Sequence, residues 1–539
     1  MRSLALGLAL CAACNALKLD ELVDPPSDPA LGRGEGLGER KADTLIVGRA
    51  ADAIGLDPAR QTDNESVEAC EQIFEHLVRY QPDSTDVEPS LAVAWKVTDN
   101  GTLWTFTLRD GVRFHDGTPL DAAAVVFSFE RQRDPFHPFH AADMVYWDNS
   151  FRNIVKVEAV DAMTVQIRVD RPYAPLLASL AMFPVSIVSP AAVKKWGDDF
   201  NRHPVGTGPF RFASWTPGDR IVLERHEGYW GPRARLSRLV FRHIPDARQR
   251  LVALEGGAVD VAYALLPEEL QYVELHPDLK LHRIAGQNVA YLAMNTTKPP
   301  FDDVRVRQAV NHAVNKVPIV KLVYQGLGVP ASGPLPPTLW SYRGDIVDYP
   351  YDKGRARMLL AEAAAHKRLE PGRTYSFYVP RTPRSYLPDP EGVARVIQKN
   401  LADVGLDTEL VVQDFARHIP DVRAGKHDLC LLGWAGDNGD PDNFLFVLLD
   451  RDPTSLAASN NVAFYRNAQL HGLLTYAQES QDHAERERYY RQAQEIVARE
   501  APWVPLAHAQ IAVAARRDLG DLRIHPSAII YYAEVWRER

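Results

Sequence analysis

The fold of this chain is decided in the stretch Leu103-Trp-Thr-Phe-Thr-Leu-Arg-Asp-Gly-Val-Arg-Phe-His-Asp-Gly117. In its first half, Trp104, Phe106 and Leu108 alternate with polar side chains, and this period of two predicts a half-buried strand. After the turn residues comes Asp121, which predicts the N-cap of a helix with an apolar face. The first clear pattern is therefore a strand followed by a helix.

The same alternation of strand and helix patterns extends along the chain. Further strands are predicted at residues 165–169, 259–263, 408–412 and 429–432. Further helices are predicted at residues 246–257, 304–325 with a break near Pro318, 391–404 and 484–500. This order predicts a mixed α/β architecture, and 539 residues exceed what one compact core usually holds. We therefore expect more than one lobe.

Residues 1–13 have the pattern of a secretory signal peptide. Arg2 supplies a positive charge, residues 4–10 form a short apolar run, and Ala12 and Ala13 are the small residues that precede a cleavage site. The apolar run is too short to span a bilayer. The sequence therefore predicts an exported protein.

Cys14 directly follows the predicted cleavage site, as the lipid-modified cysteine does in bacterial lipoproteins. Residues 14–42 are rich in proline and glycine and show no hydrophobic period. Such a composition is typical of a flexible tether. We expect a protein of the periplasm or cell exterior that is anchored to the membrane through a lipid on Cys14.

Several classes of function are disfavoured by composition and motifs. A formal net charge of −9 leaves no basic excess with which to neutralise the phosphates of a nucleic acid. The chain has no G-x-S-x-G elbow, no H-E-x-x-H and no phosphate-binding Walker loop. His137 and His140 are close in sequence, but neighbouring prolines disfavour a helix and no third ligand is evident. We expect neither a metal nor a cofactor.

The densest group of carboxylates lies in Asp437-Asn-Gly-Asp-Pro-Asp-Asn443. A calcium loop, a catalytic carboxylate pair and a tight turn are three interpretations of such a segment. The segment follows a predicted apolar strand and the residues Gly433-Trp-Ala-Gly436. Because α/β folds bind ligands beyond the carboxyl ends of their strands, the position favours a ligand site.

Five segments, taken together, resemble the peptide/nickel class of ABC-transporter solute-binding proteins. They are 103–117, Asp121-Ala-Ala-Ala-Val-Val-Phe-Ser-Phe-Glu-Arg131, Gly206-Thr-Gly-Pro-Phe210, Asp303-Val-Arg-Val-Arg-Gln-Ala309 and Gly433-Trp-Ala-Gly-Asp-Asn-Gly-Asp-Pro-Asp-Asn443. They occur in the family's order over nearly all of the chain after residue 43, and the last is similar to the dipeptide-binding branch.

This resemblance implies a bilobed, periplasmic-binding-protein-like fold with two mixed α/β lobes. One lobe would comprise residues 43–289 and 508–539, and the other residues 290–507. The chain would pass between the lobes twice, and two such strands form a hinge about which the lobes can close on a ligand.

The resemblance also implies which residues hold the ligand. Asp437 falls at the position that binds a dipeptide's ammonium group, and Arg384 at the position that binds its carboxylate. Tyr386, Trp434 and Gly436 accompany them in the expected site. Charges of opposite sign at the two ends suit a zwitterion that leaves water, and an arginine can meet a carboxylate with two hydrogen bonds.

The expected function is therefore capture of dipeptides or short peptides for the permease subunits of an ABC importer, by a monomer that is not an enzyme. Same-fold alternatives are receptors for an oligopeptide, glutathione, haem or a nickel chelate, and an exported hydrolase is the alternative from another class. Cys70 and Cys430 are the remaining cysteines, and the sequence leaves open whether they pair or stay buried as thiols.

Overall fold

The computed structural model describes residues 43–538, except for residues 347, 367–368, 371 and 452–459. The predicted signal peptide 1–13, the tether 14–42 and the lipidation site Cys14 lie outside the described residues. Within the described part of the chain, no helix combines the length and apolar character that crossing a membrane requires.

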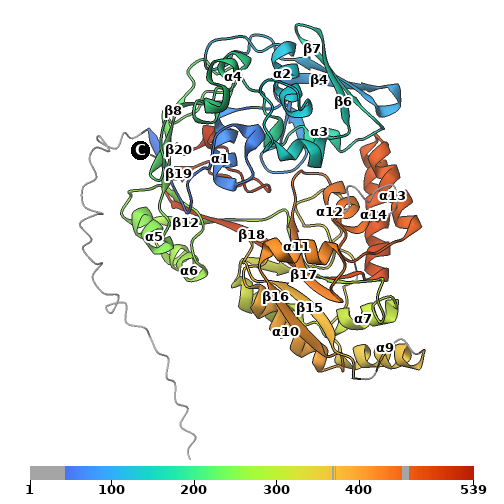
Figure 1. Cartoon of the computed structure of the whole chain (residues 1–539). Helices are drawn as coiled ribbons and strands as arrows, with labels where there is room; N and C mark the ends of the chain where they lie inside the picture. Colours follow the sequence, from blue (N-terminus) through green and yellow to red (C-terminus); the bar gives the residue numbers. More distant parts are fainter. Residues whose placement is uncertain (1–42, 347, 367–368, 371, 452–459, 539) are drawn as a thin grey trace, which may run out of the picture. The chain divides into compact units, whose positions relative to one another are not determined.

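One large twelve-stranded sheet organises the described residues (Figure 1). Its strands run in the order β16 (Thr408–Gln413), β15 (Tyr375–Pro380), β17 (Leu429–Ala435), β13 (Asn288–Met294), β18 (Trp503–Arg516), β11 (Val261–Ala262), β1 (Thr44–Arg49), β10 (Arg238–His243), β9 (Arg220–Arg225) and β8 (Phe210–Thr216). Two more strands, β12 (Leu279–Ala285) and β14 (Gly328–Pro330), pair with β18.

The described residues also form three smaller sheets and fourteen α-helices, besides short 3-10 and π-helical turns. The sheets are β4 (Ala92–Thr98), β5 (Leu103–Leu108), β7 (Thr164–Val169) and β6 (Ile154–Asp161); β2 (Val78–Tyr80) with β3 (Val87–Pro89); and β19 (Leu519–Gly520) with β20 (Trp536–Arg537). The helices are α1 (Asn64–Ile73), α2 (Ala122–Arg133), α3 (Leu176–Ser179), α4 (Pro190–Trp196), α5 (Ala247–Glu255), α6 (Pro267–Leu275), α7 (Val304–Ala313), α8 (Lys316–Ile319), α9 (Lys353–Ala365), α10 (Pro390–Ala402), α11 (Phe415–Arg423), α12 (Asp442–Leu449), α13 (Ala468–Glu479) and α14 (His483–Glu500).

The opening sequence pattern is confirmed. Trp104, Phe106 and Leu108 are buried on β5, and Asp121 caps α2 by accepting a 2.9 Å hydrogen bond from the backbone N–H of Ala124. The alternating strand and helix patterns farther along the chain also correspond to elements of the structure. The predicted mixed α/β fold class is therefore correct.

The helical segment predicted at 304–325 breaks just before Pro318. α7 ends at Ala313, Val314 and Asn315 are extended, and α8 begins at Lys316. Pro318 has no N–H to donate to the carbonyl of Val314, four residues earlier, and its ring would clash with that carbonyl in a continuous helix. In the first turn of α8 the proline is tolerated, because backbone N–H groups there have no partner within the helix. The predicted break near Pro318 is confirmed.

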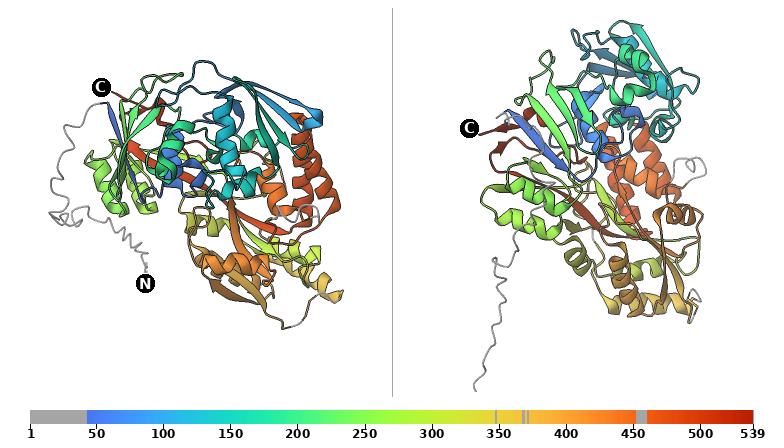
Figure 2. Two further views of the ribbon diagram at one scale, coloured as in Figure 1. Left: turned by 45° about the horizontal axis from the view of Figure 1, so that its top comes forward. Right: turned by 60° about the vertical axis from the view of Figure 1, so that its left-hand side comes forward.

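Strand β18 lies in the middle of the large sheet and connects its two halves (Figure 1; Figure 2 gives two further views of the ribbon). Its first residues pair with β13, and residues 510–516 pair with β12. Between them, Asn288 fixes the crossing: its Oδ1 accepts from the N–H of Ala509 at 2.7 Å, and its Nδ2 donates to the Ala509 oxygen at 3.0 Å. The Nδ1 of His508 lies 2.7 Å from the backbone oxygen of Asn288.

The hydrophobic cores on the two sides of this crossing draw on different stretches of sequence. Buried side chains from residues 45–279 and 513–535 form three clusters, and those from residues 289–506 form two others. The further division into two lobes that close about the crossing stays a prediction.

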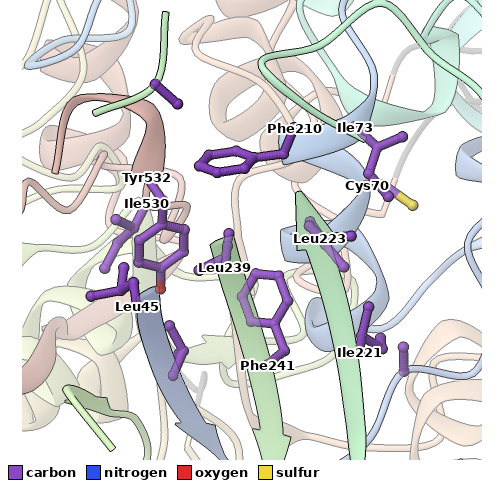
Figure 3. Close-up of a cluster of buried hydrophobic side chains, with 14 of the residues drawn as sticks. Leu45, Cys70, Ile73, Phe210, Ile221, Leu223, Leu239, Phe241, Ile530 and Tyr532 are labelled. Atoms are coloured by element: carbon purple, nitrogen blue, oxygen red, sulfur yellow. The ribbon is translucent and has the colours of Figure 1, made fainter. Parts of the chain in front are cut away.

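Both cysteines of the described chain are buried, free thiols. Cys70 lies on α1 in the cluster that includes Leu45, Phe241 and Tyr532, and Figure 3 shows how side chains from β1, β9 and β10 surround this region. Cys430 lies on β17 in a separate cluster. The two residues are therefore apolar core side chains, and the disulfide interpretation is excluded.

The segment that begins at Gly206 packs directly against the end of α1. A Cβ atom on Gly206 would lie 2.2 Å from the carbonyl oxygen of Ile73, so only glycine fits. The hydroxyl of Thr207 donates to buried Glu75 at 2.8 Å, and Tyr229 donates to the same carboxylate at 2.8 Å. This glycine-containing motif is thus a packing element of the core.

Replacing Gly206 by alanine should lower the free energy of unfolding by about 1–3 kcal/mol, because backbone atoms of Ile73 would have to move. The midpoint of thermal unfolding measures the effect. The matched control is Gly472→Ala in α13, where an added Cβ meets nothing within 4 Å and a helix gains about 0.5–1 kcal/mol. Equal midpoints for the two variants would contradict the close approach at Gly206.

Candidate functional site

The acidic segment 437–443 joins β17 to α12 and is organised by Asn443. The Oδ1 of Asn443 accepts a hydrogen bond from the indole Nε1 of Trp434 at 2.8 Å and from the backbone N–H of Asp437 at 3.1 Å. Its Nδ2 donates to the Asp437 carboxylate at 3.4 Å. One asparagine in the first turn of α12 therefore fixes both the indole ring and the carboxylate.

The other two carboxylates of the segment have structural partners. Asp440 is buried and accepts from the guanidinium of Arg486 at 2.7 and 2.8 Å and from the Tyr490 hydroxyl at 3.2 Å. Asp442 is buried and accepts from the Gln478 amide at 2.9 Å. Each of the three aspartates thus has different partners. This arrangement disfavours the two interpretations in which the carboxylates act together, as ligands of one calcium ion or as a catalytic pair.

The described residues contain no group of three or more histidine, cysteine, aspartate or glutamate side chains that could hold a metal ion. His140 instead places its Nδ1 3.1 Å from the backbone oxygen of Arg131, and His137 accepts from the N–H of Phe139 at 3.2 Å. These two histidines therefore take part in hydrogen bonds with the neighbouring backbone.

Asp437 lies where two chambers of a cavity meet. The larger chamber has a volume of about 610 Å³ and a lining of mixed polar and apolar side chains, whose polar members include Tyr146, Arg152, Arg171, Tyr173, Asn438 and Asp442. The smaller chamber has a volume of about 240 Å³ and a largely apolar lining that includes Tyr291, Tyr386, Phe415, Ile419, Leu432 and Leu448. Both chambers share Arg423, Trp434, Asp437 and Asn460.

The carboxylate of Asp437 is reached by solvent through the cavity, yet protein surrounds it closely. The carboxylate is exposed to water and yet removed from bulk solvent, because the water that reaches it is confined between the cavity walls. This partial removal from bulk water raises the pKa of Asp437 from its ordinary value to about 6, and the hydrogen bond from Asn443 acts in the opposite direction. Within the described chain, Asp437 has no ion-pair partner, so a cationic group of a ligand would complete its environment.

Three of the residues predicted from the sequence line this cavity, namely Asp437, Trp434 and Tyr386. Gly436 does not line it. Its backbone N–H donates to the oxygen of Gln287 at 2.8 Å, which ties the acidic segment to the crossing between β12 and β13. Gly436 therefore holds the acidic segment in place through its backbone, outside the cavity lining.

Arg384 lies behind the wall of the smaller chamber. Its guanidinium carbon is 3.7 Å from the centroid of the Phe415 ring, and Phe415 lines the chamber. The buried Nε of Arg384 has no hydrogen-bond partner among the described residues. The arginine is thus next to the cavity, and one aromatic ring separates it from the interior.

Sequence reasoning missed the cationic side chains of the cavity. Arg152 precedes β6, Arg171 follows β7 and Arg423 ends α11, so segments far apart in sequence bring them together. A basic residue at the last turn of a helix, such as Arg423, is common for electrostatic reasons and carries no signal of a site. Only their position in the fold identifies these residues.

Asp440→Ala should destabilise the protein by about 3–5 kcal/mol, because it leaves the buried guanidinium of Arg486 without its partner. Asp437→Asn should not destabilise it. A carboxyl whose pKa is raised by folding stabilises the fold only while protonated, so replacing it by a neutral amide keeps or increases stability at neutral pH. Thermal unfolding of both variants without ligand provides the test, and similar losses in both would contradict the separate roles of the two aspartates.

Comparison with known proteins places this chain in a family. A family model described as bacterial extracellular solute-binding proteins, family 5, matches residues 86–455. Haem-binding protein A of Haemophilus influenzae is 38% identical over 483 residues, covering 86% of this chain and 87% of that protein. The dipeptide-binding protein of Escherichia coli is 34% identical over 506 residues, covering 90% and 93%.

A solved structure of HbpA2 from Haemophilus parasuis has a TM-score of 0.87 and 31% identity, and the match covers 92% of this chain and all of that one. Proteins of this family bind solutes outside the cytoplasm for ABC importers and are not enzymes. The family match spans more than half of the chain, and the relatives align over nearly their whole length. The chain belongs to the bacterial extracellular solute-binding proteins of family 5, the peptide/nickel class of ABC-transporter binding proteins.

Proposed function

We propose that this protein captures dipeptides or short peptides and delivers them to the permease subunits of an ABC importer. The observation that carries the proposal is the carboxylate of Asp437, which lies at the junction of the two chambers without a cationic partner. A peptide's ammonium group there would replace confined water by a charge-assisted hydrogen bond. The name of the E. coli relative, a dipeptide-binding protein, agrees with this choice.

The smaller chamber suits the body of such a peptide. Its apolar walls include Phe415 and Leu432, and Tyr386 packs so closely on Gly433 that a Cβ there would lie 2.2 Å from the ring. Beyond Phe415 lies Arg384, whose Nε has no partner in the described chain. In the proposal, a side-chain rotation brings Arg384 to the peptide's carboxylate, and the two charged ends then set the peptide's length.

Closure of the cavity is part of the same proposal. Tyr146 lies opposite the acidic segment, and the charge of Asp437 adds to the burial that raises the Tyr146 pKa to about 12. The cavity walls therefore come from both sides of the crossing near Asn288. We propose that residues 43–289 with 508–539, and residues 290–507, move as two lobes about this crossing.

Haem and nickel chelates fit the cavity less well. The described residues that line the two chambers include tyrosines, which can bind haem iron, but no histidine, cysteine or methionine. Although one relative is named a haem-binding protein, the carboxylate of Asp437 and the nearby guanidinium of Arg384 together favour an organic zwitterion here. Glutathione and longer peptides share that chemistry and belong in the test.

Export, a lipid on Cys14 and a monomeric state complete the proposal. The extracytoplasmic location follows from the family. The lipid anchor is a proposal that rests on the sequence of residues 1–42 alone. The monomeric state is a separate part of the proposal. Mass spectrometry of the membrane-extracted protein would detect an acylated Cys14.

Thermal unfolding with a ligand panel tests the proposed function. A dipeptide present at 100 times its dissociation constant should stabilise the protein by about 2.7 kcal/mol. The panel contains dipeptides, tripeptides, glutathione, haemin and a nickel–histidine complex. Stabilisation by haemin or the nickel complex, with none by any peptide, would overturn the proposal.

Two variants make the panel specific. Arg384→Ala should weaken dipeptide binding by about 2–5 kcal/mol, because the bound carboxylate loses its partner. Gly472→Ala, on an open helix face away from the cavity, should bind as the unchanged protein does. A loss of dipeptide affinity of less than about tenfold in Arg384→Ala would show that this arginine does not bind the peptide's carboxylate.

Peptide affinity should fall as the pH is lowered through about 6, because protonation of Asp437 removes the charge that holds the ammonium group. The peptide keeps both of its charges between about pH 5 and 7, because its α-ammonium group loses its proton only near pH 8. Isothermal titration between about pH 5 and 7 measures the change. Asp437→Asn should bind weakly with little pH dependence. This variant retains Asp442, whose pKa is raised by burial to about 7, so it measures how much of the pH dependence comes from Asp442. Unchanged affinity below pH 6 would contradict the assignment.

A further inference from the structure

The larger chamber contains a guanidinium group that the protein itself does not use. Arg171 follows β7 and lines this chamber with an exposed side chain. Among the described residues it makes no hydrogen bond or ion pair, unlike Arg423, whose Nη2 donates to Asn460 at 2.6 Å. Arg171 is therefore a positive group available to a ligand.

The backbone beside Arg171 is held firmly. The N–H of Ala174 donates to the oxygen of Gln478 at 2.7 Å, and the hydroxyl of Tyr173 donates to Asp442 at 3.4 Å. Pro172, which directly follows Arg171, lies against Gly101, at which an added Cβ would be 3.1 Å from the proline ring. A loop fixed at these points presents its arginine from a defined place on the chamber wall.

The carboxylates near Arg171 do not neutralise it with a direct contact. Asp442 acts on it only through space, and its oxygens already accept from Gln478 and Tyr173. Asp440 is paired with Arg486. An anionic group that entered the larger chamber would therefore find a guanidinium with its donors free.

The position of Asp437 determines which part of a peptide reaches Arg171. If the ammonium group binds at Asp437 and the backbone continues into the smaller chamber, the first side chain is attached one bond from the ammonium-bearing nitrogen. That side chain would point into the larger chamber, because Asp437 lines both chambers. The two chambers thus separate the peptide backbone from its first side chain.

We propose that Arg171 selects peptides whose first residue carries a carboxylate, and that the larger chamber is the subsite for that acidic side chain. The inference rests on the proposed function, since it requires a peptide held by its ammonium group at Asp437. A carboxylate in this chamber can accept charge-assisted hydrogen bonds from the guanidinium. Arg171 is then a determinant of specificity.

Isothermal titration with the matched peptides Glu-Ala and Gln-Ala at neutral pH tests the inference on the whole protein. The unchanged protein should bind Glu-Ala about tenfold more tightly, since the two peptides differ only in one charged group. Arg171→Gln should bind both peptides equally, with little change for Gln-Ala, and Arg171→Lys should keep part of the preference. The matched control is Arg168→Gln, which removes the same charge from β7 outside the cavity, where Arg168 pairs with Asp99 at 3.2 Å.

The possible outcomes distinguish failure of the role proposed for Arg171 from failure of peptide capture itself. Equal binding of both peptides to the unchanged protein would overturn the role of Arg171 and leave peptide capture standing. An equal loss of preference in Arg168→Gln would show that only the overall charge matters and would also overturn it. Failure of every dipeptide to bind would overturn the proposed function and the inference together.

Discussion

The structure depends on the pairing of β18 with strands from both halves of the large sheet. Asn288 secures this crossing with two hydrogen bonds to Ala509, and His508 lies within hydrogen-bond distance of its backbone oxygen. These contacts satisfy backbone groups where the strand changes partners, which a buried sheet requires. From the same crossing, Gln287 accepts a hydrogen bond from Gly436, so the acidic segment is connected directly to it. A change in geometry at the crossing would therefore reach the site through a short, hydrogen-bonded path.

Within the acidic segment, the carboxylate that stabilises the fold and the carboxylate proposed to bind a ligand are different residues. Asp440 is neutralised by Arg486 and holds the segment against α14. Asp437 instead stays partly desolvated, with only the amide of Asn443 beside it. An uncompensated carboxylate costs stability, and it is retained where a ligand can supply the missing charge. The cluster is therefore a scaffold with one chemically available member.

The cavity separates two kinds of recognition. The smaller chamber has apolar walls near Asp437 and Arg384, which suits a short backbone with charges at its ends. The larger chamber is roomy and has a mixed lining, which suits variable side chains. A binding protein can then hold the common part of its ligands by fixed charges and distinguish them by what enters the second space.

The sequence by itself determined the strand and helix order, the capping residue Asp121, the mixed α/β class and the position of the acidic segment after an apolar strand. These features depend on local periodicity and turn chemistry, which neighbouring residues specify. Asp437, Trp434 and Tyr386 were identified through motifs of contiguous residues. The tertiary structure alone decided that Asp440 is neutralised by Arg486, that the backbone of Gly436 supports the acidic segment through Gln287, and that Arg171 and Arg423 share a chamber with Asp437. The reason is that burial and ion pairing depend on chain segments hundreds of residues apart, whose meeting no local pattern encodes.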